Sequence, residues 1–445
     1  MKHIVILGNG IAGITAARHI RKKSDSKITV ISGESEHFYS RTALMYIFMG
    51  HMKYEHTKPY EDWFWIKNRI ELMKEWVSEI DFSKKQLHFE SGQTLVYDQL
   101  ILATGSVSNK FGWKGENLKG VQTLYSLQDL ENIEQSTRAI KKAVIVGGGL
   151  VGVEMAEMLH YKSIDVTYLI RENHFWGNVL QNEEANLIDH HLIHDHHIDL
   201  RHSTELEEIL DDGKGHVAGV RTKSGEIIDC QFVGLTVGVS PNIQLVKNTV
   251  LETDRGILVD DFLKTNIPDV FAIGDCAQLR NPQPHRKPIE AVWYAGRMMG
   301  ETVAKTISGN ETAYRPGIWF NSAKFFDIEY QTYGQVPNEN SAGLSSFYWE
   351  SKNKKACIKI VFNEASKIVM GINTMGIRQR HEVWDEWLEK NRRLDYVIEH
   401  LGKANFDPEL FKRYEPEIQQ AYNYEFPEMP IKSLKKSFLQ KILNK

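Results

Sequence analysis

Two stretches of the chain combine a short apolar run with a glycine-rich turn and a further apolar segment. The first runs from Lys2 to Leu7, continues as Gly8-Asn9-Gly10-Ile11-Ala12-Gly13, and goes on as Ile14-Thr15-Ala16-Ala17. Short apolar runs bounded by turn residues predict buried strands, and longer patterns of small and apolar residues predict helices. We therefore expect a strand, a tight turn and a helix, in that order.

This order and glycine spacing are typical of dinucleotide binding. Gly8 permits the sharp turn, Gly10 lets the backbone approach a pyrophosphate, and Gly13 allows close packing of the helix on the strand. The phosphates are expected at the helix N-terminus, where backbone N–H groups have no partner within the helix. An acid, Glu34, follows the next predicted strand, Ile28 to Ile31, close to where a ribose hydroxyl needs a partner. A purely structural turn is disfavoured because strand, helix and acid are all present.

A second copy of the pattern follows. Ala143 to Val146 leads into Gly147-Gly148-Gly149-Leu150-Val151-Gly152, then a predicted helix and an apolar strand that ends at Ile170. Two such sites indicate two dinucleotides that must be brought together. Ile170 stands where an acid is usual, and Arg171 and Glu172 follow it. Arginine suits the extra phosphate of NADP and an acid suits the ribose of NAD, so both cofactors stay open.

Further strands and a helix are predicted between and after these two units. The strand Leu95 to Leu102 ends in Ala103-Thr104-Gly105-Ser106, and about Lys110 to Ser136 is expected to form a linker rich in glycine and polar residues. The apolar strand from Asp269 ends in Gly274-Asp275, which places the aspartate at the carboxyl end of a sheet, where ligands bind in open α/β folds. Pro288 is expected to start a helix whose glycines and alanines pack tightly on the first nucleotide fold.

The pattern changes after Pro316 to short alternating strands, which predict a separate small α+β domain. The expected strands are Ile318 to Phe320, Glu329 to Tyr333, Ser346 to Glu350, Ala356 to Phe362 and Lys367 to Ile372. From about Arg378 the chain is expected to be helical and highly charged. The fold class is therefore α/β, with two Rossmann-like domains, a small α+β domain and a helical extension.

Composition and charge exclude several classes of function. The chain has 445 residues and a formal net charge of −4, so nucleic acid is not an expected partner. Neither a secretory signal nor a membrane-spanning run is evident, and a cytoplasmic protein is expected. The three cysteines, Cys230, Cys276 and Cys357, lack C-x-x-C spacing, which argues against a dithiol and against a structural zinc site of the ribbon kind.

Two further segments carry candidate chemistry. His190, His194 and His197 fall on one face of a predicted helix from Glu183 to His197, where transition-metal binding is conceivable. No acidic or cysteine ligand completes this set, so no native metal site is expected. Ile431 to Lys445 is basic and amphipathic, which allows weak contact with an anionic membrane surface, although such a tail more often packs on protein.

These residues resemble the flavoprotein reductases of the pyridine nucleotide-disulfide oxidoreductase superfamily, in which an NAD(P) fold is inserted into an FAD fold before an interface domain. By this resemblance Gly8 to Gly13 with Glu34 would bind FAD, and so would the A-T-G segment Ala103-Thr104-Gly105, the pair Gly274-Asp275 and the backbone of Val77. Gly147, Gly149, Leu150, Val151 and Gly152 would bind NAD(P), with Glu154 near the nicotinamide. Gly238 begins the closing G-x-x-P-N segment, Gly238 to Asn242.

Departures from the family pattern affect the expected route of the electrons. Where the disulfide reductases carry a redox cysteine, this chain has Arg41 and Thr42. Without a thiolate, electrons must leave reduced flavin directly, as in the ferredoxin, rubredoxin and nitrite reductase flavoproteins. The segment Tyr39-Ser40-Arg41 resembles the Y-x-R segment of those flavoproteins. A guanidinium beside a pyrophosphate has a bidentate task, which we assign to Arg41. Those reductases often carry a lysine near flavin N5, and Tyr46 stands at that position.

The sequence therefore predicts an NAD(P)H-dependent FAD oxidoreductase with an external electron acceptor. Glu154 would position the nicotinamide, and the segment Glu290-Ala291-Val292-Trp293 would line the flavin. The acceptor would be a small molecule or a small redox protein; the alternatives are a quinone at a membrane and an NAD(H)-responsive binding module. A homodimer is expected from the resemblance alone. The predicted domains are FAD-binding (1–113 and 243–314), NAD(P)-binding (114–242), interface (315–377) and helical extension (378–445).

Overall fold

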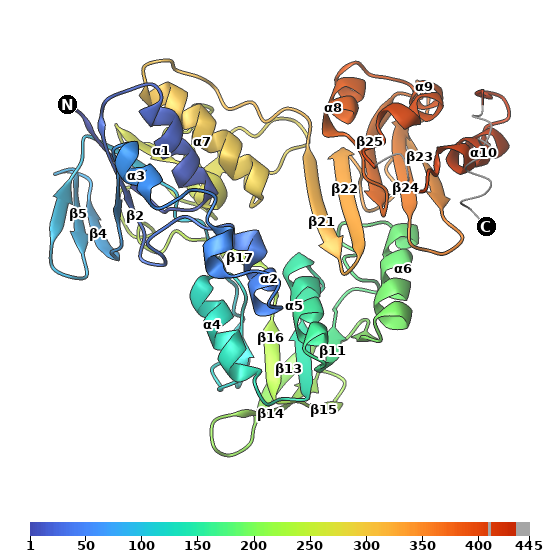
Figure 1. Cartoon of the computed structure of the whole chain (residues 1–445), viewed down its shortest axis with the longest axis horizontal. Helices are drawn as coiled ribbons and strands as arrows, with labels where there is room; N and C mark the ends of the chain where they lie inside the picture. Colours follow the sequence, from blue (N-terminus) through green and yellow to red (C-terminus); the bar gives the residue numbers. More distant parts are fainter. Residues whose placement is uncertain (408–410, 433–445) are drawn as a thin grey trace. The chain divides into compact units, whose positions relative to one another are not determined.

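The computed structural model describes residues 1–407 and 411–432 (Figure 1). Contacts within the chain divide it into two units. Unit 1 comprises Met1–Gly147, Met155–Val166 and Leu206–Pro316, and unit 2 comprises Gly148–Glu154, Thr167–Glu205 and the described residues from Gly317 onward. The predicted basic tail, Ile431 to Lys445, lies outside the described residues except for its first two positions.

A parallel sheet with strand order β19-β7-β1-β2-β3 forms the centre of unit 1. Its strands are almost entirely apolar, as expected for a parallel sheet that is buried on both faces. Pairing of β7 with β19 brings together segments about 170 residues apart, so the chain returns to its first sheet after a long excursion. The strands are β1 (His3–Leu7), β2 (Lys27–Ile31), β3 (Ile70–Met73), β7 (Gln99–Leu102) and β19 (Val270–Ala272).

Helices α1 (Ile11–Arg21) and α7 (Trp293–Ile307) pack against each other beside this sheet (Figure 1). Their approach depends on small residues, because a Cβ at Gly300 would lie 2.5 Å from the carbonyl oxygen of Ala12. This confirms the predicted tight packing on the first nucleotide fold. The predicted helix start at Pro288 is wrong, since α7 begins at Trp293 after Val292, which is extended.

Smaller elements complete the part of unit 1 around the first sheet. Three strands form an antiparallel sheet, β4 (Val77–Asp81), β5 (Gln86–Phe89) and β6 (Thr94–Val96). The pair β8 (Ser106–Ser108) and β17 (Val239–Pro241) is antiparallel, and the pair β18 (Ile257–Val259) and β20 (Ala277–Leu279) is parallel. The short helices are α2 (Leu44–Phe48), α3 (Trp63–Lys67) and the 3-10 turns η1 (Arg41–Ala43), η2 (Tyr54–Thr57) and η4 (Gly274–Cys276).

Unit 1 also contains much of the second nucleotide region. Strand β16 (Phe232–Leu235) pairs in parallel with β10 (Lys142–Val146) and with β9 (Val121–Gln122). An antiparallel sheet follows, formed by β13 (Leu206–Asp211), β14 (Val217–Thr222) and β15 (Ile227–Asp229). Helix α5 (Leu150–Tyr161) is shared between the two units.

The predicted linker from Lys110 to Ser136 is wrong in its second half, which forms helix α4 (Leu127–Ser136). A capping box starts this helix: the Ser126 side chain accepts the N–H of Asp129, and the Asp129 carboxylate accepts the N–H of Ser126. Leu130 and Ile133 are buried on one face of the helix. Both signals are present in the sequence, but the surrounding polar residues obscure them.

Unit 2 contains a second group of elements from the nucleotide region. Strand β11 (Asp165–Leu169), which belongs to this unit from Thr167 onward, pairs in parallel with β12 (Asp199–Arg201). Helix α6 (Asn182–His190) ends in a π-helical turn, η3 (His191–Asp195). The sequence predicts one regular helix from Glu183 to His197, and the structure corrects this at His191, where the helical period widens.

The remainder of unit 2 is an antiparallel sheet, order β21-β22-β25-β24-β23, covered by helices (Figure 1). The strands are β21 (Phe320–Phe325), β22 (Ile328–Gly334), β23 (Leu344–Glu350), β24 (Cys357–Asn363) and β25 (Val369–Met375). Four of the five predicted strands are confirmed; the first begins at Phe320 rather than Ile318. The helices are α8 (His381–Glu389), α9 (Leu394–Glu399), η5 (Leu401–Lys403) and α10 (Glu415–Glu425).

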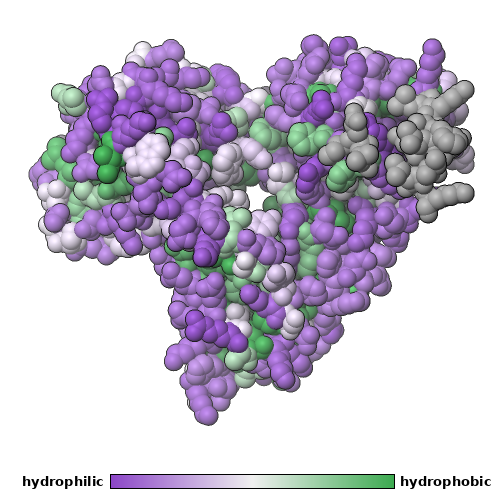
Figure 2. Space-filling view, in the orientation of Figure 1, coloured by the Kyte–Doolittle hydropathy of each residue, from purple (hydrophilic) through white to green (hydrophobic). Residues whose placement is uncertain are grey.

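Sheet and helices of unit 2 share one hydrophobic core, in which Phe347 and Ile360 of the sheet join Trp384, Val397 and Tyr422 of the helices. The proposed boundary at residue 377 therefore falls inside a continuous core. Hydrophilic residues cover most of the face seen in Figure 2. Among the described residues, no helix has the length and apolar character needed to cross a membrane.

Candidate nucleotide-binding sites

The first glycine turn is built by close backbone contacts at two of its glycines. Gly8 has φ +116°, and a Cβ there would lie 2.0 Å from the carbonyl oxygen of Ala103. A Cβ at Gly13 would lie 2.0 Å from the carbonyl oxygen of Gly8. By contrast, a Cβ at Gly10 would meet no atom within 4 Å. Gly8 and Gly13 are therefore required by the fold, whereas Gly10 faces open space that a ligand can enter.

The same turn offers an anion site at the start of α1. Gly10 is the N-cap residue, and within the described residues no side chain caps this helix. Exposed N–H groups at a helix N-terminus bind phosphate through hydrogen bonds and the helix dipole. Asn9 holds the turn in place, because its Nδ2 donates to the carbonyl oxygen of Ser35 at 2.8 Å. Ile11 and Ala12 open the helix.

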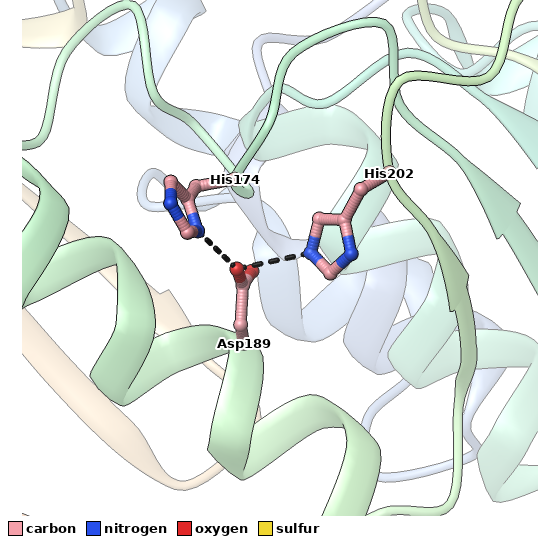
Figure 3. Close-up of side chains that lie close together, drawn as sticks. All are labelled: His174, Asp189 and His202. Carbon is pink, nitrogen blue, oxygen red and sulfur yellow. Dashed lines mark hydrogen bonds and ion pairs between the residues drawn. The ribbon is translucent and has the colours of Figure 1, made fainter.

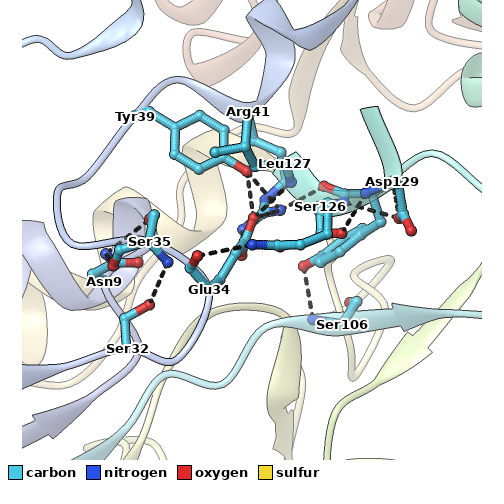
Figure 4. A network of polar contacts seen from close by, with 12 residues as sticks. Asn9, Ser32, Glu34, Ser35, Tyr39, Arg41, Ser106, Ser126, Leu127 and Asp129 are labelled. Atoms are coloured by element: carbon cyan, nitrogen blue, oxygen red, sulfur yellow. Dashed lines mark hydrogen bonds and ion pairs between the residues drawn. The ribbon is translucent and has the colours of Figure 1, made fainter. Parts of the chain in front are cut away.

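Glu34 lies at the centre of a polar network (Figure 4). Its carboxylate accepts hydrogen bonds from Arg41 at 2.7 and 3.0 Å, from the N–H of Leu127 at 3.0 Å, and from the hydroxyl of Tyr39. Burial alone would raise the pKa of Glu34, but the hydrogen bonds and charge of Arg41 outweigh burial and lower that pKa. Glu34, assigned to the ribose, and Arg41, assigned to the pyrophosphate, thus form an ion pair with each other. A ligand that binds to either side chain must share it with the other.

Tyr125 belongs to the same network, although the sequence analysis did not single it out. Its ring lies 4.5 Å from the guanidinium carbon of Arg41, and its carbonyl oxygen accepts a hydrogen bond from Arg41. Its hydroxyl accepts the N–H of Ser106 at 2.8 Å. Tyr125 directly precedes the capping residue Ser126, so the start of β8, Arg41 and the start of α4 are joined. A lone tyrosine before a helix cap carries no sequence signal for this role.

Asp275 lies in the 3-10 turn η4, beside the start of α1. A Cβ at Gly274 would lie 3.0 Å from the Cβ of Ala12, which places the Gly274-Asp275 pair close to the first glycine turn. The Asp275 carboxylate accepts a hydrogen bond from the Ser106 hydroxyl at 3.0 Å. Burial raises the pKa of Asp275. The structure therefore brings together the two predicted motifs that lie 260 residues apart in the sequence.

The Thr104-Gly105 segment joins the closing end of the second nucleotide region. The Thr104 hydroxyl donates to the carbonyl oxygen of Asn242 at 2.7 Å, and the N–H of Asn242 donates to the carbonyl oxygen of Gly105 at 2.9 Å. Gly105 and Gly238 have φ of +71° and +90°, which favours glycine at both positions. The A-T-G and G-x-x-P-N segments therefore form one junction, built on the β8–β17 pair.

The segment predicted to line the flavin has a different local arrangement. Glu290 is buried and forms a two-pronged ion pair with Arg286, at 2.5 Å and 2.6 Å, so its carboxylate is already engaged. Trp293 is the first residue of α7 and is 37% exposed. Ala291 is exposed, and Val292 is the extended N-cap residue.

Three other predicted positions lie in short elements of unit 1. Thr42 is exposed in η1, with its hydroxyl 3.1 Å from that of Ser40, and Val77 begins β4. Tyr46, at the position where related reductases carry a lysine, lies in α2 with its ring stacked on His51.

The second glycine turn repeats the geometry of the first. Gly147 also has φ +116°, and a Cβ there would lie 2.5 Å from the carbonyl oxygen of Thr236. A Cβ at Gly149 would again meet no atom within 4 Å. The required glycine and the open glycine therefore occupy equivalent positions in both turns. Four predicted residues lie in the first part of α5: Leu150, Val151, Gly152 and Glu154.

Glu172, rather than Arg171, lies close to the second turn. A Cβ at Gly148 would be 3.5 Å from Oε2 of Glu172. The Arg171 side chain is 75% exposed and donates to the other carboxylate oxygen of Glu172 at 3.0 Å. The sequence left open whether Arg171 or Glu172 faces the second turn. The structure places the Glu172 carboxylate there.

All three cysteines lie among the described residues, and all are buried. Burial raises the pKa of each thiol, to about 12 for Cys230. The Cys276 thiol points at the backbone, 3.3 Å from the carbonyl oxygen of Ile273 and 3.5 Å from that of Leu102. A buried, protonated thiol is a poor nucleophile and a poor redox group. Burial therefore disfavours the thiolate form at all three cysteines.

The histidine-rich segment forms different groups from the predicted face. The rings of His190 and His194 lie 4.5 Å apart, but His197 follows the end of the π-turn with φ +54° and does not continue the helix. Instead, Asp189 accepts hydrogen bonds from Nδ1 of His174 at 2.9 Å and from Nε2 of His202 at 3.0 Å (Figure 3). His191 and His196 form a second group, with Asp327.

Comparison with known families identifies the chain. The family model described as pyridine nucleotide-disulphide oxidoreductase matches residues 2–300. The chain belongs to this family. Members are flavoprotein oxidoreductases that use FAD and NAD(P)H, and the two glycine turns fit these cofactors because each combines an open glycine with an uncrowded helix start.

Similar proteins agree with this assignment. The chain is 31% identical to nitrite reductase [NAD(P)H] of Bacillus subtilis over 63% of its own length, but it spans only 35% of that relative. It is 30% identical to the ferredoxin–NAD(+) reductase component of the biphenyl dioxygenase system of Paraburkholderia xenovorans, over 62% of this chain and 67% of that one. The fold is shared with an NAD-dependent persulfide reductase from A. fulgidus, with a TM-score of 0.82 at 23% identity over 96% of this chain and 83% of that chain.

Proposed function

We propose that this oxidoreductase passes electrons from NADH through FAD directly to an external acceptor, a small redox protein of the ferredoxin or rubredoxin type. The observation that carries the proposal is the state of the sulfur atoms: Cys230, Cys276 and Cys357 are buried as thiols, and Arg41 and Thr42 occupy the expected position of a redox cysteine. The named function of the Paraburkholderia relative supports the class of acceptor.

Binding and orientation are the tasks of the chain's own residues. The start of α1 and the backbone at Gly10 would hold the FAD pyrophosphate, Glu34 would face the adenosine ribose, and Asp275 with Ser106 would face the ribityl chain. When bound, FAD supplies a ring that takes two electrons from reduced nicotinamide and releases them to an acceptor. The start of α5 at Gly149 would hold the nicotinamide dinucleotide, with Glu154 as the positioning residue.

The preference for NADH rests on Glu172. Its carboxylate lies near Gly148 and is positioned to accept a ribose hydroxyl, whereas the 2′-phosphate of NADPH would meet this negative charge. Arg171 points into solvent and already pairs with Glu172.

The first half of the reaction is tested by anaerobic stopped-flow reduction of the FAD-loaded protein. NADH should bleach the flavin absorbance faster than NADPH. Gly149→Ala should abolish this bleaching because its new methyl group fills the space open to the dinucleotide, while reduction by dithionite and FAD content stay normal. Equal bleaching in wild type and Gly149→Ala would contradict the assigned nicotinamide site.

The second half of the reaction is tested by offering the reduced protein a ferredoxin, a rubredoxin, a soluble quinone and dioxygen. Turnover should be fastest with an iron–sulfur protein, and a Cys230→Ser, Cys276→Ser, Cys357→Ser triple variant that retains FAD should keep that turnover. Faster turnover with the quinone or dioxygen would contradict the acceptor class. Loss of acceptor reduction with normal flavin reduction in the triple variant would contradict direct electron exit. A homodimer in the cytoplasm completes the proposal.

A further inference from the structure

His191, His196 and Asp327 bring three ligand atoms together in unit 2. Nε2 of His191 lies 2.7 Å from Oδ1 of Asp327 and 3.2 Å from Nε2 of His196. Nε2 of His196 lies 3.0 Å from the same carboxylate oxygen. Two imidazole nitrogens and one carboxylate oxygen thus lie within 3.2 Å of one another.

The π-helical turn produces this arrangement. The N–H of His196 donates to the carbonyl oxygen of His191, five residues earlier, at 3.3 Å. A period of five residues puts these two side chains on one face, whereas the ordinary helical period would separate them. Single π-turns occur often at functional sites because they realign side chains in this way.

Hydrogen bonding at His191 leaves a lone pair at the centre. Its Nδ1 lies 2.7 Å from Oδ2 of Asp195, so the N–H of a neutral ring donates there. Nε2 then carries a lone pair that faces the Asp327 oxygen and a second imidazole nitrogen. His191 is fully buried, so water cannot separate these groups at its ring. A metal ion or a proton must therefore lie between the His191 nitrogen and the Asp327 oxygen.

The separation of the two nitrogens fits a bound metal ion. A tetrahedral ion with bonds of about 2.0–2.1 Å holds its ligand atoms about 3.3 Å apart, close to the observed separation of the two nitrogens. Oδ1 of Asp327 lies closer to the two nitrogens than that, at 2.7 and 3.0 Å, but its side chain is 58% exposed and can retreat by the roughly half an ångström that the ion requires.

Charge and surroundings also suit a divalent ion. Lys355 lies 3.2 Å from Oδ2 of Asp195 and 3.5 Å from Oδ2 of Asp327, which leaves Oδ1 of Asp327 for the centre. Two carboxylates and one ammonium group leave a net negative charge for the cation to neutralise. A carboxylate on the outer nitrogen of a ligating histidine, as Asp195 is here, orients the ring and raises its basicity.

We propose that His191, His196 and Asp327 bind a divalent transition-metal ion of the Zn²⁺ class, with Asp195 as the positioning residue for His191. Three protein ligands with an exposed side leave a fourth position for water. Asp327 lies in the turn between β21 and β22, so the ion ties the π-turn after α6 to this hairpin. The residues differ from His190, His194 and His197, for which the sequence predicts no metal.

The group in Figure 3 provides a matched comparison. His174 and His202 can each donate one N–H to Asp189 while both rings are neutral, and Oδ1 of Asp189 accepts the N–H of Phe175 at 3.0 Å. This group is satisfied by hydrogen bonds and needs no cation. It contains the same residue types in the same unit, and we therefore use it as the control.

The test is equilibrium dialysis of the tag-free, FAD-loaded full chain against Zn²⁺ after chelator treatment, with bound zinc measured by metal analysis. Wild type should retain one zinc per chain, and excess Mg²⁺ should not displace it, because nitrogen ligands do not favour Mg²⁺. Asp327→Asn and His196→Gln should lose the zinc, and Asp195→Asn should bind it about 10–100-fold more weakly. His202→Gln should bind zinc as wild type does.

Folding of each variant is checked by circular dichroism and FAD content, and Asp327→Asn is the main variant because its side chain is exposed. Two outcomes overturn the proposal. One is a wild-type chain that retains no zinc, which would leave protons as the occupants of the centre. The other is that folded Asp327→Asn and His196→Gln both retain zinc, whether His202→Gln loses it or retains it.

Discussion

At the scale of single residues, the glycines of the first turn separate structure from binding. Gly10→Ala should leave the fold intact but weaken FAD binding by at least about tenfold, because its methyl group meets open space that the ligand needs. Fluorescence titration of the FAD-depleted protein measures the affinity, and thermal unfolding of the same FAD-depleted sample measures the fold.

Gly8→Ala is the matched control for this experiment. Its methyl group would collide with the backbone of Ala103 at a positive φ, so the FAD-depleted protein should unfold at a clearly lower temperature than Gly10→Ala. If Gly10→Ala and Gly8→Ala lose the same stability, Gly10 is also a structural glycine and its assigned role fails.

The same residues show what the sequence could predict. Gly8, Gly13 and Asp275 lie where the motifs place them, because backbone conformation and close approach dictate glycine locally. The part played by Tyr125 and the N–H of Leu127 could not be predicted, because both come from about ninety residues further along the chain. Glu34 and Arg41 lie only seven residues apart, but the sequence assigned each to a different part of the ligand and not to the other. Glu290 likewise pairs with Arg286, but the sequence spacing alone does not show whether its carboxylate meets this side chain or solvent.

At the scale of elements, adjacent acids at the start of α6 should respond in opposite ways to substitution. Burial raises the pKa of Glu184 to about 7. Between pH 4.5 and 7 the folded state therefore holds a proton that the unfolded state has lost, and stability falls as the pH rises through this range. Glu184→Gln should stabilise the protein by about 1–3 kcal/mol at pH 8, and this gain should vanish near pH 4.5.

Glu183→Gln is the neighbouring control. Glu183 pairs with Nζ of Lys359 at 3.1 Å, and the Lys359 side chain is fully buried, so removal of the carboxylate leaves a buried ammonium without its ion pair. This variant should lose stability at pH 8. Urea unfolding of both variants at several pH values checks the pair. A destabilised Glu184→Gln at pH 8 would show that the fold stabilises the ionised Glu184 carboxylate, which contradicts a raised pKa.

Elements with a strong local pattern were predictable from the sequence, and those that depend on an irregular backbone were not. The strands of the first parallel sheet and of the five-stranded antiparallel sheet of unit 2 follow apolar runs. Four of the five strands predicted for the antiparallel sheet are confirmed. The π-turn at His191 widens the helical period, but no glycine or proline in this helix indicates it in the sequence. Helix α7 begins at Trp293 and not at Pro288, because the backbone at Val292 is extended.

At the scale of the whole molecule, every described residue assigned to FAD belongs to unit 1. FAD at 100 times its dissociation constant should stabilise the state that binds it by about 2.7 kcal/mol. Hydrogen exchange should therefore slow in β1 and β7 when FAD is added to the depleted protein, and change less in β24. Mass spectrometry of peptides from these strands measures the difference; equal protection of β24 would contradict an FAD site confined to unit 1.

The order of nucleotide folds along the chain could be read from the sequence because each repeats the same strand, turn and helix. The return of β19 to the first sheet was implied only by the resemblance, since pairing over about 170 residues leaves no local pattern. The shared core of the antiparallel sheet and the C-terminal helices was not foreseen either, because charged surface residues dominate that part of the sequence.

The burial of the three cysteine thiols affects how the enzyme tolerates dioxygen. Reduced flavins that meet dioxygen generate hydrogen peroxide, and exposed thiolates are its usual first targets. Cys230, Cys276 and Cys357 are each at most 1% exposed, so peroxide formed by a misdirected turnover finds none of them accessible. An enzyme with this arrangement can release peroxide without inactivating itself through oxidation of its cysteines.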